Sequence, residues 1–454
     1  MEEVDVVVVG GGPAGSSAGR AAAARGADTV VLEKGVPRAD REGVGPDSTD
    51  AAGMLDYWLD LMELDPSELP DGVILQELDG ADFYGPREHL ALDSTGISAS
   101  YDRFGFTFNR ARFDDFLRSE AEAAGASYRT GTGVRDVTSD LSGGEHRHEV
   151  TLADGTTIAG EYLVLADGPQ RQVTIPVLDE YLPNRTAGTR LAPPSANHIA
   201  YQEHRRFPEE LFDEHRLKFW WGWIPGETAY PWVFPNDGTV ARVGLTMPIG
   251  MDIENFEKAD YRLLREGDDR IPDGGTYIRR LLEELYGDDY DIETDFPLVQ
   301  DRGKRDGTET YPISSTRPIE SPVAAGIAVT GGAMGATSAF HEGGDHTAVA
   351  TGQLAGRLAA SGQLDRYNAA WQAQVGNEIL RSVVFADLVE SYQPADWDDA
   401  FRTASRLRNP GRLTPTLSAG LSGLSLVARY RLRKLRLRRR GYTQIRTEEY
   451  RLPG

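Results

Sequence analysis

Residues 6–33, VVVVGGGPAGSSAGRAAAARGADTVVLE, contain the pattern that decides the fold. Val6–Val9 is a continuous β-branched run, which is typical of a parallel strand buried on both faces. Glycines in the spacing GxGxxG follow it directly, and the alanine-rich stretch Ser16–Arg25 predicts a helix. A second strand is predicted over Thr29–Leu32, and it ends at Glu33. The pattern therefore predicts a βαβ unit whose first turn opens a helix.

Each part of this unit suits the binding of a dinucleotide. Gly10 permits the tight turn, Gly12 lets the backbone approach a pyrophosphate, and Gly15 lets helix and strand pack closely. The helix N-terminus offers free N–H groups to phosphate. Glu33 stands where a carboxylate binds ribose hydroxyls and disfavours a 2′-phosphate, so FAD or NAD fits better than NADP. The predicted cofactor-binding residues here are Gly10, Gly12, Pro13, Ala14, Gly15, Glu33 and Lys34.

Composition excludes several classes of protein. The chain has 454 residues and no cysteine, which rules out disulfides, thiolate nucleophiles and cysteine-bound metal clusters, and no metal site is predicted. With 71 acidic and 48 basic residues the net charge is −23, which argues against nucleic-acid binding. Only five basic residues are lysines, and this acidic, lysine-poor composition resembles that of proteins from salt-loving archaea.

The termini and hydropathy predict a cytoplasmic protein. Residues 1–9 are acidic and then strand-like, without the basic region or cleavage site of a secretory signal. No run of about 18 apolar residues that could span a bilayer is present.

Three further segments resemble the FAD-dependent oxidoreductases that share a fold with p-hydroxybenzoate hydroxylase. A predicted strand over Glu161–Asp167 leads into Asp167-Gly168, another over 326–330 leads into Gly331-Gly332, and Asn109–Asp114 (NRARFD) resembles the family's DRxxFD. The resemblance covers about residues 5–175 and 318–372. It implies bound FAD, with Arg110, Asp167, Gly168 and Gly331 among the residues that contact it.

The family's Gly-Asp pair is the main departure in this region. Gly332 replaces the aspartate that binds the ribityl chain, and Asp345 lies 13 residues further on. The resemblance also implies that residues 341–346 open a helix whose N-terminus points at the flavin, with Gly343 and Gly344 letting the ring approach. A helix N-terminus there would stabilise the anion of reduced flavin.

Residues 176–317 have a different character. Aromatic, alternating segments predict strands over 198–203, 217–223, 230–235 and 240–247, and the Asn236-Asp237-Gly238 turn predicts that the last two form a hairpin. Four tryptophans fall between Trp220 and Trp232. Such a cluster beside a flavin favours a large apolar substrate.

One motif in this region resembles the geranylgeranyl reductase family. Tyr230–Pro235 (YPWVFP) matches its Tyr-x-Trp-x-Phe-Pro, and Ala241–Leu245 resembles its next strand. Those enzymes use reduced FAD to hydrogenate C=C bonds of isoprenoid chains, and the resemblance implies that Tyr230, Trp232 and Phe234 line a prenyl-chain tunnel. We add Trp221 and Trp223 to the predicted substrate-binding residues.

The proton donor is left open by a second departure from the family. Archaeal members often carry Cys-Gly-Glu after the second strand, whereas this chain has residues 41–48 (REGVGPDS) there. Saturating a C=C bond needs a proton as well as a hydride. The candidate donors are Tyr230, His341, Glu342 and a bound water.

The predicted fold class is α/β: a Rossmann-like FAD-binding domain with an inserted antiparallel-sheet substrate domain and a C-terminal helical, basic tail. The predicted FAD-binding domain is discontinuous (1–60, 98–175 and 318–372). Residues 61–97 and 176–317 form the predicted substrate-binding domain, and 373–454 form the C-terminal region.

The tail inverts the charge of the chain. Residues 402–451 hold 14 basic and two acidic side chains, so the remainder carries about −35. Residues 412–440 join an apolar stretch to a basic one, as in segments that bind anionic membranes. Three alternatives stay open for the tail. It attaches peripherally to the inner face of the cell membrane, it docks onto the acidic body or a partner, or it is solvated.

The sequence therefore predicts an FAD-dependent reductase of a prenyl chain in a lipid or quinone. A single dinucleotide fingerprint implies a transient electron donor, either NAD(P)H or a ferredoxin-like protein. The alternatives are a flavin-dependent dehydrogenase or monooxygenase acting on another apolar substrate, and a non-catalytic flavin- or lipid-binding protein.

Overall fold

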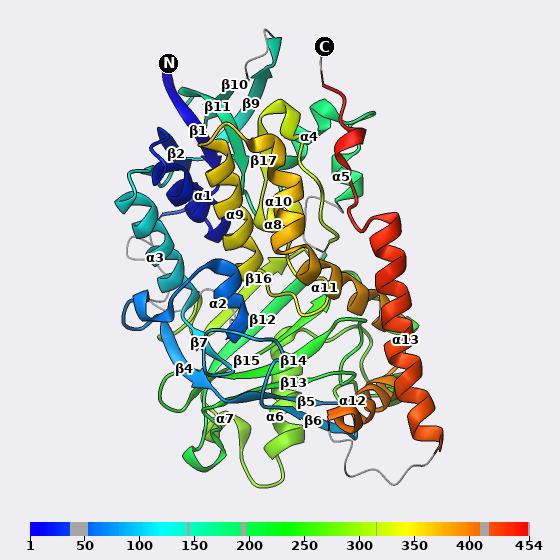
Figure 1. Cartoon of the computed structure of the whole chain (residues 1–454). Helices are drawn as coiled ribbons and strands as arrows, with labels where there is room; N and C mark the ends of the chain where they lie inside the picture. Colours follow the sequence, from blue (N-terminus) through cyan, green and yellow to red (C-terminus); the bar gives the residue numbers. More distant parts are fainter. Residues whose placement is uncertain (37–52, 143–145, 192–196, 315, 409–416, 453–454) are drawn as a thin grey trace.

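The computed structural model describes residues 1–36, 53–142, 146–191, 197–314, 316–408 and 417–452. Two seven-stranded sheets and one three-stranded sheet form the framework, and helices lie around them (Figure 1). Residues 41–48, which stand where archaeal members of the resembled family often carry Cys-Gly-Glu, lie outside this described part, as do residues 412–416 of the predicted membrane segment.

The first sheet has the strand order β8-β2-β1-β11-β10-β9, and β17 also pairs with β11. The pairings among β8, β2, β1, β11 and β17 are parallel, whereas β9 and β10 are antiparallel additions. Its strands are β1 (Glu2–Val9), β2 (Thr29–Leu32), β8 (Ser127–Arg129), β9 (Val134–Asp140), β10 (Arg147–Leu152), β11 (Thr157–Leu165) and β17 (Ile327–Val329). The parallel unit predicted from residues 6–33 is confirmed.

Helix α1 (Pro13–Ala23) begins three residues earlier than predicted because Pro13 occupies the first helical position, where its missing N–H is no loss. It packs directly on α9 (Asp345–Ala359). A Cβ on Gly352 would lie 2.0 Å from the carbonyl oxygen of Ala14, so this crossing depends on small residues. The start of α1 is thereby fixed against the middle of α9.

The second sheet has the order β16-β12-β15-β14-β13-β5-β6. Its strands are β5 (Gly80–Tyr84), β6 (His89–Leu92), β12 (His198–Arg206), β13 (Arg216–Trp220), β14 (Tyr230–Pro235), β15 (Val240–Pro248) and β16 (Thr308–Ile313). The predicted β14–β15 hairpin is confirmed. Strand β13 stops at Trp220, short of the predicted Trp223, because the chain turns at Gly222, whose φ is +73°.

The three-stranded sheet consists of β3 (Gly53–Leu55), β7 (Gly105–Phe108) and β4 (Ile74–Leu78). Strand β4 therefore pairs with β7, although it lies within the 61–97 segment that was assigned to the substrate domain. The remaining helices longer than one turn are α2 (Asp56–Met62), α3 (Arg110–Ala123), α4 (Thr174–Tyr181), α6 (Gly274–Tyr286), α10 (Tyr367–Gln374), α11 (Gly376–Val389), α12 (Pro394–Arg408) and α13 (Leu417–Arg440). The one-turn helices are α5 (Ala187–Arg190), α7 (Ile292–Asp295) and α8 (Gly331–Met334).

The end of the chain returns to the first sheet after α13. Ile445 is fully buried in the core of that domain, and the Tyr450 hydroxyl donates a hydrogen bond to the carbonyl of Glu320 at 2.7 Å. In Figure 1, α13 (red) runs along one side of the molecule, beside α11 and α12. Residues 442–451 therefore act as a strap across the FAD-binding side.

Candidate functional site

The glycines of the fingerprint turn have distinct structural requirements. Gly10 has φ +98°, and a Cβ there would lie 2.3 Å from the carbonyl oxygen of Ala166. A Cβ on Gly15 would lie 1.8 Å from the carbonyl oxygen of Gly10. A Cβ on Gly12 would meet no atom within 4 Å. Gly10 and Gly15 thus allow close packing, while Gly12 leaves open space before the N-terminus of α1, as a pyrophosphate requires.

The acid at the end of β2 is held against the same turn. The Glu33 carboxylate accepts hydrogen bonds from the backbone N–H of Gly11 and of Gly35, both at 2.6 Å. Lys34 is exposed beside it. Tyr128, which the sequence reasoning did not select, donates to the carbonyl of Gly11 at 2.6 Å and braces the turn from β8.

The predicted Asp167-Gly168 segment forms a capped turn. The Asp167 carboxylate accepts from the N–H groups of Val173 and Thr174 at 2.7 and 3.0 Å, at the start of α4, and Gly168 has φ +77°. In this structure Asp167 therefore shapes the turn, and its predicted contact with FAD stays a prediction.

Arg171, just beyond this turn, was missed by the sequence reasoning. Its guanidinium is buried and donates to the carbonyls of Ala333 and Gly332 at 2.8 and 3.1 Å and to the Ser314 hydroxyl at 2.9 Å. Burial lowers its pKa to about 10. The side chain ties the Asp167-Gly168 turn to α8, and only its position next to a family motif could have indicated this.

Gly331 and Gly332 form the first turn of α8. Gly331 has φ +56°, and a Cβ on Gly332 would lie 3.3 Å from the backbone nitrogen of Pro169. The family's aspartate would thus be crowded at Gly332. Asp345, the first residue of α9, lies 3.2 Å from Nη1 of Arg110, so the structure brings together two residues that the sequence could only place separately.

The loop before α9 is bonded to the second sheet. The Tyr230 hydroxyl donates to the carbonyl of His341 at 2.7 Å. The Glu342 carboxylate accepts from the Thr246 hydroxyl and lies 2.5 Å from Nδ1 of His198. Glu342 itself has φ +60°, a left-handed conformation that costs a non-glycine residue free energy. Side chains from β12, β14 and β15 therefore fix residues 341–342, and Gly343 and Gly344 follow directly into α9.

Burial sets the protonation of this loop. It raises the pKa of Tyr230 well above its usual range, and the charge of Glu342 adds to this effect. Burial also lowers the pKa of His341 to about 4. Nδ1 of His341 accepts from the N–H of Gly343 at 3.2 Å, which assigns the imidazole proton to Nε2. At neutral pH both side chains are uncharged.

A second aromatic side chain missed by sequence reasoning is Trp58 of α2. Its ring stacks on His346 with a centroid distance of 4.1 Å and on His341 with one of 5.3 Å. Behind this stack, the Tyr57 hydroxyl donates to Glu378 at 3.1 Å and accepts from Arg381 at 2.6 Å. The start of α9 therefore faces a wall of stacked rings backed by a buried charged network.

Four of the five predicted substrate-binding side chains share one cluster. The rings of Tyr230, Trp232 and Phe234 project from the same face of β14, and Trp221 stacks on Tyr230 with a centroid distance of 4.3 Å. All four side chains are buried. Trp223 is not brought together with them: it packs on the opposite side of the sheet, donates to the carbonyl of Gly85 and lies under Arg262.

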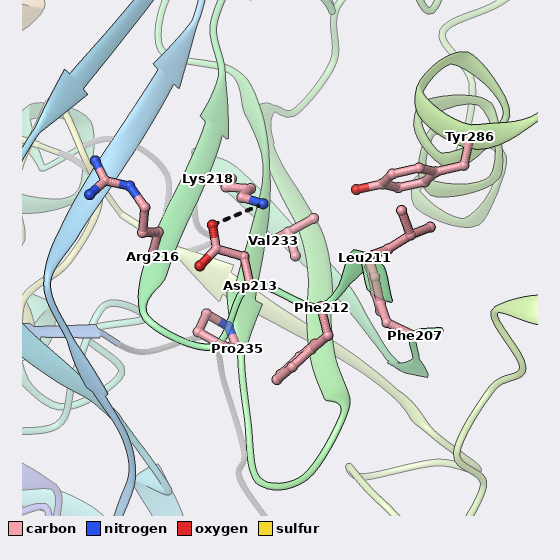
Figure 2. A pocket seen from close by; sticks show the side chains of 9 residues that line it. All are labelled: Phe207, Leu211, Phe212, Asp213, Arg216, Lys218, Val233, Pro235 and Tyr286. Atoms are coloured by element: carbon pink, nitrogen blue, oxygen red, sulfur yellow. Dashed lines mark ion pairs between the residues drawn. The ribbon is translucent and has the colours of Figure 1, made fainter. Parts of the chain in front are cut away.

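A small pocket lies on that opposite side (Figure 2). Val233 and Pro235 line it, together with Tyr286 of α6 and Lys218, which pairs with Asp213 at 3.3 Å. Val233 alternates with Trp232 along β14, so this pocket and the aromatic cluster use different faces. Across the described residues, no group of three or more histidine, aspartate or glutamate side chains could hold a metal ion.

One face of the basic helix α13 packs on the body. The ring of Tyr430 lies 5.1 Å from that of Phe385, and Arg433 donates to the carbonyl of Asp387. Leu432 and Leu435 are 67% and 46% exposed. The structure thus places part of the tail against the protein and leaves apolar side chains on its outer face. Among the described residues, no helix is long and apolar enough to cross a membrane.

The sequence of this chain is similar to the sequences of known proteins. Residues 5–68 match the family described as FAD binding domain. A digeranylgeranylglycerophospholipid reductase of Picrophilus torridus is 28% identical over 57% of this chain and 59% of its own length. The reductase of that name from Methanothrix thermoacetophila is 26% identical over 87% of this chain and 89% of its own.

Solved structures show the same fold. A geranylgeranyl bacteriochlorophyll reductase-like protein of Thermoplasma acidophilum superposes with a TM-score of 0.69 at 20% identity, covering 97% of this chain and 99% of that one. The myxobacterial FAD-dependent chondrochloren halogenase gives 0.58 at 19% identity and covers 92% of each chain.

Fold and fingerprint define an FAD-binding flavoprotein, which confirms the predicted fold class and cofactor. The predicted resemblance to geranylgeranyl-type reductases is confirmed by the curated relatives. The matched stretch spans about three-fifths of the length of the first of these relatives. Adaptation to high salt stays a prediction.

Proposed function

We propose that this chain is an FAD-dependent reductase that saturates C=C bonds of a prenyl chain carried by a lipid or quinone. The observation that carries the proposal is the direct bonding of the aromatic face of β14 to the loop that opens α9, through Tyr230 and His341. A large apolar surface and a flavin-type helix N-terminus are thereby held against each other. The names of the curated relatives support the substrate class.

The residues of the chain fit FAD at two places. Gly12 leaves room at the N-terminus of α1 for the pyrophosphate, and Gly343 and Gly344, both half-buried, stand directly before the N-terminus of α9. FAD, when bound, supplies the hydride for reduction of the double bond. The uncharged aromatic side chains bind and orient the apolar chain and exclude water.

The proton must come from a group near His341 and Glu342. Tyr230 is a poor candidate, because its hydroxyl proton is committed to the carbonyl of His341 and burial raises its pKa. His341 is neutral and carries its only proton on Nε2, so we propose that this N–H orients a water, that the water supplies the proton, and that solvent replaces it. Glu342, which accepts from Thr246 and lies beside His198, holds the loop in position for this water.

We also propose that the outer face of α13 rests on an anionic membrane. Exposed Leu432 and Leu435 stand among the basic side chains of residues 429–440, a combination that suits the lipid interface. The substrate would then be taken from the membrane that the protein lies on. Electrons are proposed to come from a transient donor.

The reductase activity is tested under anaerobic conditions. The protein with FAD bound is reduced with dithionite, mixed with geranylgeranyl lipids and quinones, and the products are analysed by mass spectrometry. Stepwise gains of two hydrogens are expected. In a parallel reaction in air, substrate-dependent consumption of O₂ with no hydrogenated product would instead favour a monooxygenase.

Membrane binding is tested by substitution rather than truncation, because the strap that follows α13 is buried in the FAD-binding side. Leu432→Glu with Leu435→Glu should abolish co-sedimentation with anionic vesicles at moderate salt. Ile249→Glu, an exposed apolar position on the second-sheet side, is the matched control. Equal binding by both variants would contradict the assignment.

A further inference from the structure

A buried network of polar side chains lies behind the loop that opens α9. The Tyr57 hydroxyl of α2 donates to one carboxylate oxygen of Glu378 of α11 at 3.1 Å. Arg381, three residues further along α11, donates to the other oxygen of Glu378 and, at 2.6 Å, to the Tyr57 hydroxyl. The three side chains therefore close a ring of hydrogen bonds between α2 and α11. We call Tyr57, Glu378 and Arg381 the latch.

The latch holds charges in a buried place. Tyr57 and Glu378 are both buried, and Arg381 is half-buried. Taking a carboxylate and its partner out of water costs free energy that their attraction often does not recover, so an apolar pair of similar volume is often at least as stable. Burial also raises the pKa of Tyr57, and the charge of Glu378 raises it further, so the hydroxyl keeps its proton. The cost of this arrangement indicates a role in the adjoining site.

Trp58, the neighbour of Tyr57 in the chain, connects the latch to the loop. Its ring is parallel to that of His346, with an interplanar angle of 2° and a centroid distance of 4.1 Å. It also stacks on His341 at 25° and 5.3 Å. His346 is fully buried, and its Nε2 lies 3.9 Å from Glu378. The latch therefore adjoins both the helix that carries Trp58 and the ring on which Trp58 stacks.

The other end of α2 is bonded independently of the latch. The carbonyl of Met62 accepts from the side chain of Gln353 at 2.8 Å, and the carbonyl of Leu61 accepts from that of Gln374 at 3.2 Å. Trp58 is the third residue of α2, next to the latch. A change in the latch should therefore move Trp58 without releasing the whole helix.

The surroundings of His341 leave one of its hydrogen-bonding positions open. Its carbonyl accepts from Tyr230, its backbone N–H donates to the Ser338 hydroxyl at 3.1 Å, and Nδ1 accepts from the N–H of Gly343. Among the described residues, Nε2 has no hydrogen-bond partner. The direction of the Nε2–H therefore depends on the orientation of the ring, and the ring stacks on Trp58.

The two charges of the latch act on His341 in opposite directions. Burial lowers the pKa of His341 to about 4, the carboxylate of Glu378 raises this pKa, and the guanidinium of Arg381 lowers it. Burial also lowers the pKa of His346 well below its usual range, so that imidazole is neutral. The remaining acid of the loop, Glu342, is paired on the side of the second sheet. The latch thus sets two opposed charges behind a neutral His341.

We propose that Trp58 and the latch are positioning residues for His341, and that they hold its imidazole so that the Nε2–H meets the water that supplies the proton. This proposal rests on the proposed function. Trp58 sets the place of the ring by stacking, and the latch sets the place of Trp58. Glu378 and Arg381 are kept together because either charge alone would change the protonation of His341.

The experiment follows the imidazole of His341 by NMR. The protein carries oxidised FAD and ¹⁵N-labelled histidine, and no substrate is added, so the signals report protonation and tautomer without turnover. His341→Asn assigns the signals among the eight histidines. The latch variants are Glu378→Gln, Arg381→Met and the double variant. Arg317→Met is the matched control, because Arg317 pairs at 2.9 Å with Asp387 of the same helix α11.

The single latch variants should shift the pKa of His341 in opposite directions. Arg381→Met should raise it, because the charge of Glu378 loses its partner, and Glu378→Gln should lower it. The double variant should return toward the wild-type value, since both charges are gone. Arg317→Met should leave the signals of His341 unchanged. Loss of a merely structural contact would not reverse the sign of the shift.

Trp58 is tested by the rate of prenyl reduction. Trp58→Leu should lower kcat by about tenfold to a hundredfold, the usual effect of a small misplacement of a reacting group, with KM and the FAD content unchanged. Trp58→Phe keeps an aromatic ring and should keep most of the rate.

Other outcomes overturn the proposal. Shifts of the same sign in both single latch variants, or no shift in either, would show that the latch does not act on His341. Equal kcat values of Trp58→Leu and wild type would show that stacking does not position the imidazole. If the wild-type protein reduces no prenyl substrate, the proposed function fails, and the histidine signals still decide whether the latch acts on His341.

Discussion

Replacing Tyr230 by phenylalanine separates two roles that the sequence assigned to one residue. The hydroxyl was a candidate proton donor, yet in the structure it donates to the carbonyl of His341 from a fully buried site. Tyr230→Phe keeps the ring stacked on Trp221 and removes only this hydrogen bond. The structure predicts that the substitution affects the position of the loop, with little direct effect on proton transfer.

The expected loss of unfolding free energy follows from the carbonyl that is left without a hydrogen-bond donor. The half-buried carbonyl of His341 loses its hydrogen-bond donor, which costs about 1–3 kcal/mol if no water replaces the hydroxyl. Because Glu342 is already strained at φ +60°, the weakened loop has free energy to gain by leaving this position. We expect the unfolding free energy to fall by about 1–3 kcal/mol and the rate of prenyl reduction to fall by no more than about tenfold.

The assay combines urea unfolding with anaerobic stopped-flow measurement of flavin reoxidation by a geranylgeranyl substrate. Tyr201→Phe is the control, since the Tyr201 hydroxyl donates to Glu203 at 2.9 Å on the opposite face of the sheet. Loss of a general acid typically costs 10² to 10⁴ in rate. A rate loss of about a hundredfold or more, with unchanged stability, would refute the positioning role.

Two further perturbations test the fingerprint and the buried histidines. Gly12→Ala should fold normally but bind less FAD, because its Cβ enters only the open space before α1. Gly10→Ala should bind less FAD and also be less stable, because its Cβ would meet the carbonyl oxygen of Ala166. Flavin absorbance per chain measures FAD binding, and the melting temperature measures stability. The pKa values of His148 and His204, lowered chiefly by burial to about 4 and about 3, lie below the unfolded value of about 6.5. On acidification these histidines therefore take up protons in the unfolded chain before they do so in the folded one. Their contribution to the unfolding free energy is fully present above about pH 6.5. At pH 5.5 the unfolding free energy is lower by about 1.4 kcal/mol for each histidine. Urea midpoints of wild type and His204→Leu should differ in pH slope, and identical slopes would contradict this.

Much of the FAD half could be predicted because its signals are local. The turn at Gly10 and Gly12, the buried β1 run and the following helix are set by backbone sterics and by period, which neighbouring residues reveal. The β14–β15 hairpin was predicted for the same reason, from Asn236-Asp237-Gly238 between alternating strands.

Side-chain contacts between residues far apart in the chain could not be predicted from local sequence patterns. Trp58 stacks on two histidines nearly 300 residues away in the chain, and Arg171 gathers carbonyls from α8. Nothing in the spacing of these residues indicates a partner, because the contacts arise only when the two sheets pack. Trp223 illustrates the converse: its place in an aromatic cluster suggested the substrate face, and the turn at Gly222 sends it to the other side.

The sequence by itself determined the dinucleotide-binding unit, the antiparallel aromatic sheet and the charge division between body and tail, since local sterics, periodicity and composition are properties of short segments. The tertiary structure alone decided that Arg110 meets Asp345, that three strands hold His341 and Glu342, and that the strap after α13 is buried. These contacts depend on how whole elements pack, and packing is fixed by the burial of surfaces that lie far apart in the chain.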